Sequence, residues 1–168
     1  MKAYFTASTS GNADLLPHYT RILDLITRHA VSLTSGPQII SSQMLSDDKK
    51  LSSKEIFERQ KKRIEESDFI IAETSKPSHG VGGEIVYALS IGKPVLALVH
   101  VTFEDHISPM VAGNPDENLF IEYYEEDSNK LPRSKLRGIV GNILDDTVKQ
   151  LYLSSIHLGV SPALILNV

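Results

Sequence analysis

Residues 78–84 combine a hydroxyl, three glycines and a carboxylate in one short run, Ser-His-Gly-Val-Gly-Gly-Glu. The glycines Gly80, Gly82 and Gly83 leave backbone N–H groups unshielded, and such groups at a helix start can bind a phosphate or carboxylate. A carboxylate in the first helical turn is favoured in its charged form, so we expect Glu84 to be ionised at neutral pH. An ionised carboxylate in a pocket can attack a sugar carbon of oxocarbenium character. The simpler alternative is a tight turn whose Glu84 only complements the helix dipole.

The elements that would position this run are a strand before it and a helix and a strand after it. Residues 69–72, Phe-Ile-Ile-Ala, are typical of a strand buried on both faces of a parallel sheet. Residues 74–83 predict a loop, residues 84–91 a helix that ends at Gly-Lys-Pro, and residues 95–99 the next strand. Ligands of such a strand-helix-strand unit bind at the carboxyl ends of its strands, so we expect chemistry near residues 73–84.

The rest of the chain predicts further alternation of strands and helices. A capping box, Ser52-x-x-Glu55, predicts a helix over residues 53–66, with Ile56, Gln60 and Ile64 on its inward stripe. The other predicted elements are a strand at residues 2–8, a helix at 15–29, a second strand around 38–42, a long loop at 100–118, a fifth strand at 119–123 and an amphipathic helix within 134–153. The length fits one domain spanning residues 1–168.

The composition excludes several classes of function. The chain has 168 residues, of which 41% are hydrophobic and 23% charged, as is usual for a soluble globular protein. A formal net charge of -4 argues against a binder of polymeric nucleic acid. The absence of cysteine excludes thiolate nucleophiles, and the six histidines lack metal-ligand spacing, so we expect no metal and no cofactor. Without a signal peptide or a long apolar run, we expect a cytoplasmic protein with no membrane partner.

The run at residues 67–98, SDFIIAETSKPSHGVGGEIVYALSIGKPVLAL, resembles the core motif of the nucleoside 2-deoxyribosyltransferase superfamily. It is most similar to the 2'-deoxynucleoside 5'-phosphate N-hydrolase branch of that superfamily. The likeness extends to residues 4–8, Tyr-Phe-Thr-Ala-Ser, and to residues 107–110, Ile-Ser-Pro-Met. The core Ser-x-Gly-Val-Gly-x-Glu is its most specific part.

This resemblance implies roles for particular residues. Glu84 would act at the anomeric carbon of the sugar, and Ser78 and Gly80 would hold the 5'-phosphate. Ser108 of a neighbouring subunit would reach the same phosphate, which implies a homodimer or a higher homo-oligomer. Tyr4 either lines the pocket, as the N-terminal aromatic residue of the family does, or is an ordinary core tyrosine.

Two residues depart from the family pattern. Gln60 stands where the family has an aspartate; its amide can form hydrogen bonds but cannot ionise, so it can orient a substrate without transferring a proton. The alternative is an amide at the edge of the buried stripe, bonded to a loop backbone. Ser10 stands where the first loop of the family carries an arginine. Phosphate binding would then rest on hydroxyls such as that of Ser8, on backbone amides and on Lys76 as a substitute cation.

Together these observations predict a three-layer, flavodoxin-like (Rossmann-like) α/β sandwich with a five-stranded parallel sheet. The predicted activity is an N-glycosidase that hydrolyses the base–sugar bond of (deoxy)nucleoside 5'-monophosphates through a carboxylate at C1'. The hydroxyl of Ser78 favours a phosphorylated substrate over a nucleoside. Two alternatives stay open: a nucleoside 2-deoxyribosyltransferase that exchanges bases, and a catalytically weak or inactive nucleotide-binding module, which the neutral Gln60 and Ser10 suggest.

Overall fold

The computed structural model describes residues 2–10, 13–28, 31–41, 46, 48 and 50–125. The predicted helix within residues 134–153 and the apolar tail after it lie outside the described residues. In chain order the elements are β1 (Lys2–Ala7), α1 (Leu16–Arg28), β2 (Ser32–Ser35), α2 (Pro37–Ile40), α4 (Ser53–Glu65), β3 (Phe69–Glu73), α5 (His79–Ser90), β4 (Val95–His100), the 3-10 helix η1 (Val101–His106), α6 (Pro109–Ala112) and β5 (Leu119–Tyr124).

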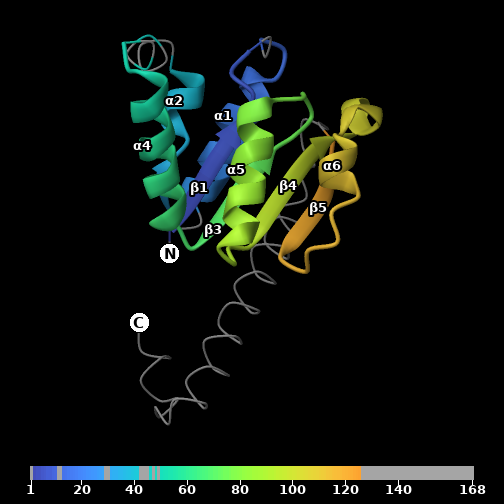
Figure 1. Cartoon of the computed structure of the whole chain (residues 1–168). Helices are drawn as coiled ribbons and strands as arrows, with labels where there is room; N and C mark the ends of the chain where they lie inside the picture. Colours follow the sequence, from blue (N-terminus) through green and yellow to red (C-terminus); the bar gives the residue numbers. More distant parts are fainter. Residues whose placement is uncertain are drawn as a thin grey trace, which may run out of the picture. The chain divides into compact units, whose positions relative to one another are not determined.

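The five strands form one sheet in the order β2-β1-β3-β4-β5, and every neighbouring pair is parallel (Figure 1). This is the strand order of flavodoxin-like doubly wound folds, so the predicted fold is confirmed. The order reverses between β1 and β3, and ligands of such sheets bind beyond the carboxyl ends of the strands at that point. Ser8 follows β1 there, and Thr74 follows β3.

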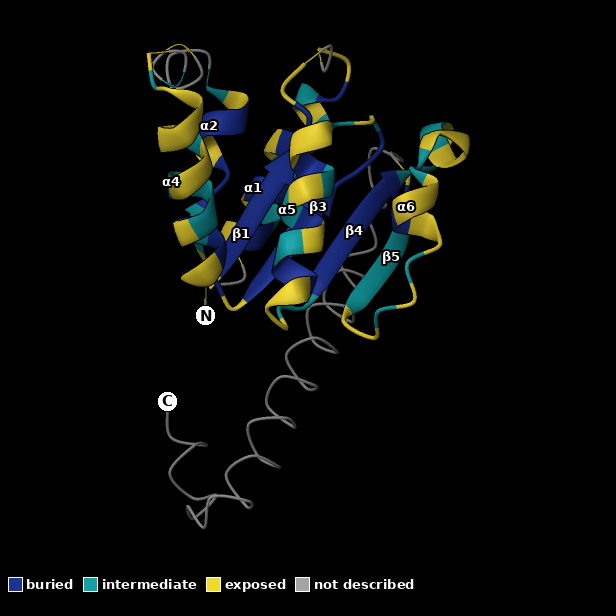
Figure 2. Cartoon of the chain, in the orientation of Figure 1, coloured by how far each residue is buried: buried dark blue, intermediate teal, exposed yellow. Residues whose placement is uncertain are grey.

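The two faces of the sheet are covered by different helices. Helices α4 and α5 lie on one face and α1 on the other (Figure 1). Tyr4 of β1 and Ala72 of β3 join the buried cluster that contains Ile85 of α5, whereas the next residue of β1, Phe5, packs edge-on against Tyr19 of α1 at a centroid distance of 6.3 Å. All of β3 and β4 as far as Val99 is buried (Figure 2), as expected of central strands that are covered on both faces.

The prediction of a strand around residues 38–42 is wrong. The second strand ends at Ser35, and the chain then turns through Gly36 into the short helix α2. Gly36 has φ 147°, and a Cβ atom added there would lie 2.6 Å from Leu23 Cδ2, so both conformation and space require glycine. Pro37 suits a first helical position, and the Gln38 side-chain oxygen accepts from Gly36 N at 3.0 Å. This side-chain bond stabilises the turn in place of strand pairing.

The expected loop at residues 74–83 ends earlier than predicted. Helix α5 begins at His79, with Ser78 as its N-cap, whereas the sequence pattern placed its start at Glu84. The buried side chains of Val81 and Ile85 hold the glycine-rich turn in helical form against the sheet. The capping box at Ser52 is confirmed: the hydroxyl accepts from Glu55 N, and the Glu55 carboxylate accepts from Ser52 N at 2.8 Å. Helix η1 and helix α6 lie within the predicted loop at residues 100–118.

The chain as far as Tyr124 forms one compact unit. Because residues 126–168 lie outside the described part, a single domain over residues 1–168 stays a prediction. None of the helices in the described residues is both long and apolar enough to span a membrane.

Candidate active site

Helix α5 and strand β1 bring Glu84 and Tyr4 together. The Tyr4 hydroxyl donates a hydrogen bond to Glu84 Oε1 at 2.8 Å, across 80 residues of sequence. Glu84 Oε2 is screened from solvent and has no hydrogen-bond partner among the described residues. The tyrosine ring is buried in the cluster below α5, so its position is fixed by packing. One carboxylate oxygen is therefore held in place, while the other is not engaged by a hydrogen bond from the described residues.

Burial changes the acid strength of both groups. Desolvation raises the pKa of the Glu84 carboxyl above 4.5, and the nearby hydroxyls of Thr6 and Tyr4 oppose this shift. Burial and then the Glu84 charge raise the pKa of the Tyr4 phenol far above its usual value, so Tyr4 stays a hydrogen-bond donor. The expectation that Glu84 lies in the first helical turn is wrong, because Glu84 is the sixth residue of α5, and burial rather than the helix dipole sets the direction of its pKa shift.

The N-terminus of α5 carries the predicted phosphate-binding residues. Ser78 Oγ accepts from Val81 N at 3.4 Å, and Gly80 is exposed. A Cβ atom added at Gly80 would meet only Ser78 Oγ, at 3.8 Å, and one added at Gly82 would meet nothing within 4 Å. Packing within the described chain therefore does not require these glycines. They leave open space above a helix end that favours anions.

Ser8 and Ser10 follow β1 at the same edge of the sheet as Ser78. Ser8 is buried, and its hydroxyl donates to the Ser10 carbonyl oxygen at 3.2 Å, whereas Ser10 is exposed. The hydroxyl of Ser8 is thus engaged in shaping its own loop, and Ser10 presents its side chain to solvent. The topology brings both residues toward the switch point between β1 and β3.

Ser108 lies on the other side of α5 from Glu84. It is the N-cap of α6, and together with Ser78 it lines a pocket of about 590 Å³. The rest of this pocket is mainly apolar, with Val86 and Met110 both exposed. Glu84 is not among its lining residues. Within one chain, the predicted residues therefore divide into a Tyr4–Glu84 pair that faces β1 and a serine-lined pocket between α5 and α6.

Lys76, the suggested substitute for the family arginine, forms an ion pair with Asp14 Oδ1 at 2.6 Å. Lys76 also lines the serine-lined pocket. Its charge is thus partly neutralised where a phosphate would have to compete for it. Among the described residues no cluster of three or more histidine or acidic side chains could hold a metal ion, and the expectation of a metal-free site stays a prediction.

Gln60 lies half-buried on α4, with its side-chain oxygen accepting from Arg63 Nη1 at 3.2 Å. Its partner is therefore a cationic side chain one turn along the same helix. On this helix the sequence pattern singled out Gln60 and missed Arg59 and Arg63, which are both half-buried. Their spacing from Ile56 and Gln60, which places them at the edge of the inward stripe, is the signal that could have found them.

The chain is similar to known proteins in sequence and in fold. The family model described as nucleoside 2-deoxyribosyltransferase matches residues 3–132. A protein of Thermofilum pendens named "Putative 2'-deoxynucleoside 5'-phosphate N-hydrolase 1" is 35% identical over 127 residues, which is 75% of this chain and 87% of that protein. The 5-hydroxymethyl-dUMP N-hydrolase of Rattus norvegicus is 28% identical over 117 residues, 70% of this chain and 72% of that protein.

Among solved structures, the Clostridium botulinum CMP N-glycosidase BcmB has a similar fold, with a TM-score of 0.55. The match covers 81% of this chain and 99% of that one at 18% sequence identity. At that identity the likeness supports the α/β fold alone.

Proposed function

This chain belongs to the nucleoside 2-deoxyribosyltransferase family, and from that premise we propose that it is an N-glycosidase that hydrolyses the base–sugar bond of nucleoside 5'-monophosphates. The observation that carries the proposal is the Tyr4–Glu84 pair, in which one carboxylate oxygen is held and the other has no partner among the described residues. Two relatives named as N-hydrolases of nucleotides support the same reaction.

The proposed reaction begins at Glu84. An ionised Glu84 oxygen attacks C1' of the sugar, the C1'–N bond breaks, and its electron pair leaves with the base. Water then attacks C1', releases the carboxylate and supplies the proton that the base requires. Tyr4 orients the carboxylate through its 2.8 Å hydrogen bond, and its buried ring fixes the angle. The products are the free base and the sugar 5-phosphate.

The N-terminus of α5 is proposed to hold the 5'-phosphate. The hydroxyl of Ser78 and the backbone N–H of Gly80 provide hydrogen-bond donors beside the positive end of the helix dipole. Gly82 contributes open space, since its N–H donates to the Ser78 carbonyl oxygen at 3.0 Å. Ser8 and Ser10 contribute from the end of β1. Because the same helix carries Glu84, the phosphate anchors the substrate on the element that carries the reacting carboxylate. Such positioning makes attack at C1' effectively intramolecular.

We also propose that the protein is a homodimer and is located in the cytoplasm. Val86 and Met110 are exposed apolar side chains beside Ser108, and a second copy packed on them would bring its own Ser108 toward Ser78. A Met110→Glu substitution is expected to give a monomer by light scattering, with weaker binding of the monophosphate. The cytoplasmic location, like the absence of a polymeric nucleic acid or membrane partner, rests on the sequence composition.

The experiment that tests the function uses a panel of ribo- and deoxyribonucleoside 5'-monophosphates with the matching nucleosides. We expect release of free base, measured by chromatography, from monophosphates but only weakly from nucleosides. A second free base added to the same reactions separates hydrolysis from transfer, because a transferase would form a new nucleotide. Binding without base release from any member would support the non-catalytic module instead. Unchanged release by a folded Glu84→Ala variant would contradict the role of Glu84.

A further inference from the structure

The side of α4 that faces the protein is polar over its second and third turns. Arg59, Gln60 and Arg63 are half-buried there, as is Lys61 over the ring of Tyr87, whereas Glu58 and Lys62 of the same turns are exposed. Burying guanidinium groups has a cost that solvent-facing positions would avoid. Packing alone therefore does not explain two arginines on this side of the helix. Helix α4 lies beside α5 and β2, which places this polar side next to the elements of the candidate site.

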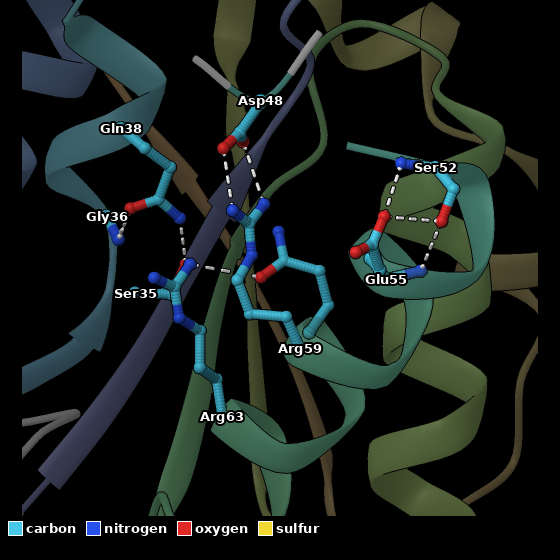
Figure 3. Close-up of polar contacts among 9 residues, drawn as sticks. Ser35, Gly36, Gln38, Asp48, Ser52, Glu55, Arg59 and Arg63 are labelled. Atoms are coloured by element: carbon cyan, nitrogen blue, oxygen red, sulfur yellow. Dashed lines mark hydrogen bonds and ion pairs between the residues drawn. The ribbon is translucent and has the colours of Figure 1, made fainter. Parts of the chain in front are cut away.

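The two arginines differ in how their charge is balanced. Arg59 forms a bidentate ion pair with Asp48, with N–O distances of 2.7 and 2.8 Å (Figure 3). Arg63 forms no ion pair within the described part of the chain, and its one hydrogen bond there runs to the neutral oxygen of Gln60 at 3.2 Å. Within the described residues, the charge of Arg63 is thus not offset by an ion pair. Gln60 fixes the direction of its guanidinium without neutralising it.

Arg63 acts on the same tyrosine that holds Glu84. Burial and Glu84 raise the pKa of the Tyr4 phenol, and the Arg63 guanidinium is among the groups that oppose this shift. The charge of Arg63 is the smallest of these influences on the Tyr4 hydroxyl, which donates to Glu84 at 2.8 Å. A sugar whose C1' contacts Glu84, with its phosphate at Ser78, would direct its base away from the phosphate end. On the Tyr4 side of Glu84 lie the hydroxyls of Thr6 and Ser35, and α4 packs beside them against β2 and α5.

We propose that Arg63, held by Gln60, contacts the leaving base and stabilises the negative charge that develops on it. The inference rests on the proposed N-glycosidase function. When the C1'–N bond breaks, its electron pair passes to the ring nitrogen of the base. Gln60 has no proton to give, and a guanidinium does not deprotonate in proteins, so the base departs as an anion and takes its proton from water afterwards. A fixed positive charge stabilises that anion in the transition state.

This chemistry selects a class of base. Bases whose anion is spread over two carbonyl oxygens, the 2,4-dioxopyrimidines of the uracil type, can leave without prior protonation. Adenine and cytosine leave readily only when an acid protonates the ring, and Gln60 is not an acid. The preferred substrates are therefore uracil-type nucleoside 5'-monophosphates. Arginine also suits the task better than lysine, because its planar fork can meet a ring nitrogen and a carbonyl oxygen together.

The test measures single-turnover release of base from three 2'-deoxynucleotides, 5-fluoro-dUMP, dUMP and dTMP, whose free bases decrease in acidity in that order. We expect Arg63→Gln to lose about 10- to 100-fold with dTMP, in the range found for removing one electrostatic stabiliser, and clearly less with 5-fluoro-dUMP. The rate then depends more steeply on leaving-group acidity than in the wild type. Arg63→Lys keeps the charge, so its rates should lie between those of Arg63→Gln and the wild type. Its dependence of rate on leaving-group acidity should also be intermediate.

Lys62→Gln is the matched control, because it removes the same charge from the exposed side of the same helix. It should leave the rates and their dependence on the base unchanged. An equal loss on all three substrates, or no loss, in folded Arg63→Gln would overturn the role of Arg63 and leave the N-glycosidase function standing. If Arg63→Gln does not fold, Arg63→Lys replaces it in the test, and a dependence of its rate on leaving-group acidity equal to that of the wild type would overturn the role of Arg63. No base release by the wild type from any monophosphate would overturn both proposals.

Discussion

One carboxylate lies against each face of the sheet, and only one of the two is placed to react. Glu84 lies on α5 and faces Tyr4, while Glu73 ends β3 and belongs to the face covered by α1. Burial raises the pKa of both carboxyl groups, and each accepts a hydrogen bond from a tyrosine hydroxyl, that of Tyr4 or Tyr124. By acidity and first partner alone, the two carboxylates are equivalent.

Their surroundings separate them. Glu73 is 0% exposed, and its Oε1 accepts from three donors: the Tyr124 hydroxyl, and the hydroxyl and backbone N–H of Ser75 in the turn that follows it. Its Oε2, like Glu84 Oε2, has no hydrogen-bond partner among the described residues, so the two groups differ in the bonds on the held oxygen and in exposure. Ser75 in turn accepts from His100 N at 2.7 Å, so Glu73 ties the ends of β3 and β4 together. Glu84 has no such partners from its own turn, and the residue is half-buried beside glycines that leave open space.

The comparison shows that a shifted pKa alone does not identify a catalytic group. Desolvation perturbs any buried carboxyl, whether or not a ligand reaches it. The distinguishing features are the number of hydrogen bonds supplied by the surrounding fold and the access that remains. Glu73 has several hydrogen bonds from the fold and no exposure, as expected of a structural group. Glu84 has fewer such bonds and keeps some exposure, as expected of a catalytic group.

The sharpest way to break this comparison is to neutralise each carboxylate in turn. Glu84→Gln keeps the size and the hydrogen bond from Tyr4 but cannot attack C1', so base release should fall by at least ~10³-fold. Glu73→Gln should retain activity close to that of the wild type, because its amide oxygen can still accept from Ser75 and Tyr124. Single-turnover base release with circular dichroism on the same samples measures both. Comparable losses in two folded variants would show that the carboxylates do not differ in role.

The two tyrosines provide a second, smaller contrast. Tyr4→Phe removes a hydrogen bond that lowers the pKa of Glu84, so the acidic limb of the kcat/KM profile should move to higher pH. A hydrogen bond to a charged group contributes about 1.5–3 kcal/mol, so the loss of activity should be roughly 10- to 100-fold. Tyr124→Phe removes the corresponding donor from Glu73 and should leave the acidic limb in place. A shift of that limb in Tyr124→Phe alone would reverse the assignment of the two carboxylates.

The sequence predicted the fold well because the signals were local. The uninterrupted apolar run of β3 and the capping box of α4 are short-range patterns, and both elements form close to where they were expected. The second strand was misplaced because a single glycine at φ 147° diverts the chain, and its need for glycine comes from Leu23, which is distant in sequence. The start of α5 was missed because the packing of Val81 against the sheet outweighs the low helix propensity of three glycines.

The site was less accessible to sequence reasoning. The run at residues 78–84 was enough to select Glu84, Ser78 and the glycines as site residues. The raised pKa of Glu84 could not be predicted in this way, because it depends on burial by residues far along the chain. The division between the Tyr4–Glu84 pair and the serine-lined pocket follows from which side of α5 each residue occupies. The sequence does not show which arginine is paired: Asp48 forms its ion pair with Arg59, whereas Arg63 donates to the neutral Gln60. Such pairings are tertiary facts with no local signature.

The smallest expected effect concerns stability. Because burial raises the folded-state pKa of Glu73 above 4.5, its favourable contribution is complete below that pH and is lost as pH rises through the folded pKa. Glu73→Gln cannot ionise and loses nothing over this range. Its Tm relative to wild type should therefore increase from about pH 4 to about pH 8, at roughly 2–4 °C per kcal/mol for a domain of this size.

Glu84→Gln serves as the control for this measurement, since Glu84 has a pKa shift of the same sign but is only half-buried. It should flatten the pH dependence of Tm less than Glu73→Gln does, because the more deeply enclosed carboxylate has the larger cost of ionisation. Thermal unfolding followed by circular dichroism across the pH range gives both curves. A greater flattening in Glu84→Gln would mean that Glu84 is the more enclosed of the two, and the structural basis for choosing it as the reacting carboxylate would be lost.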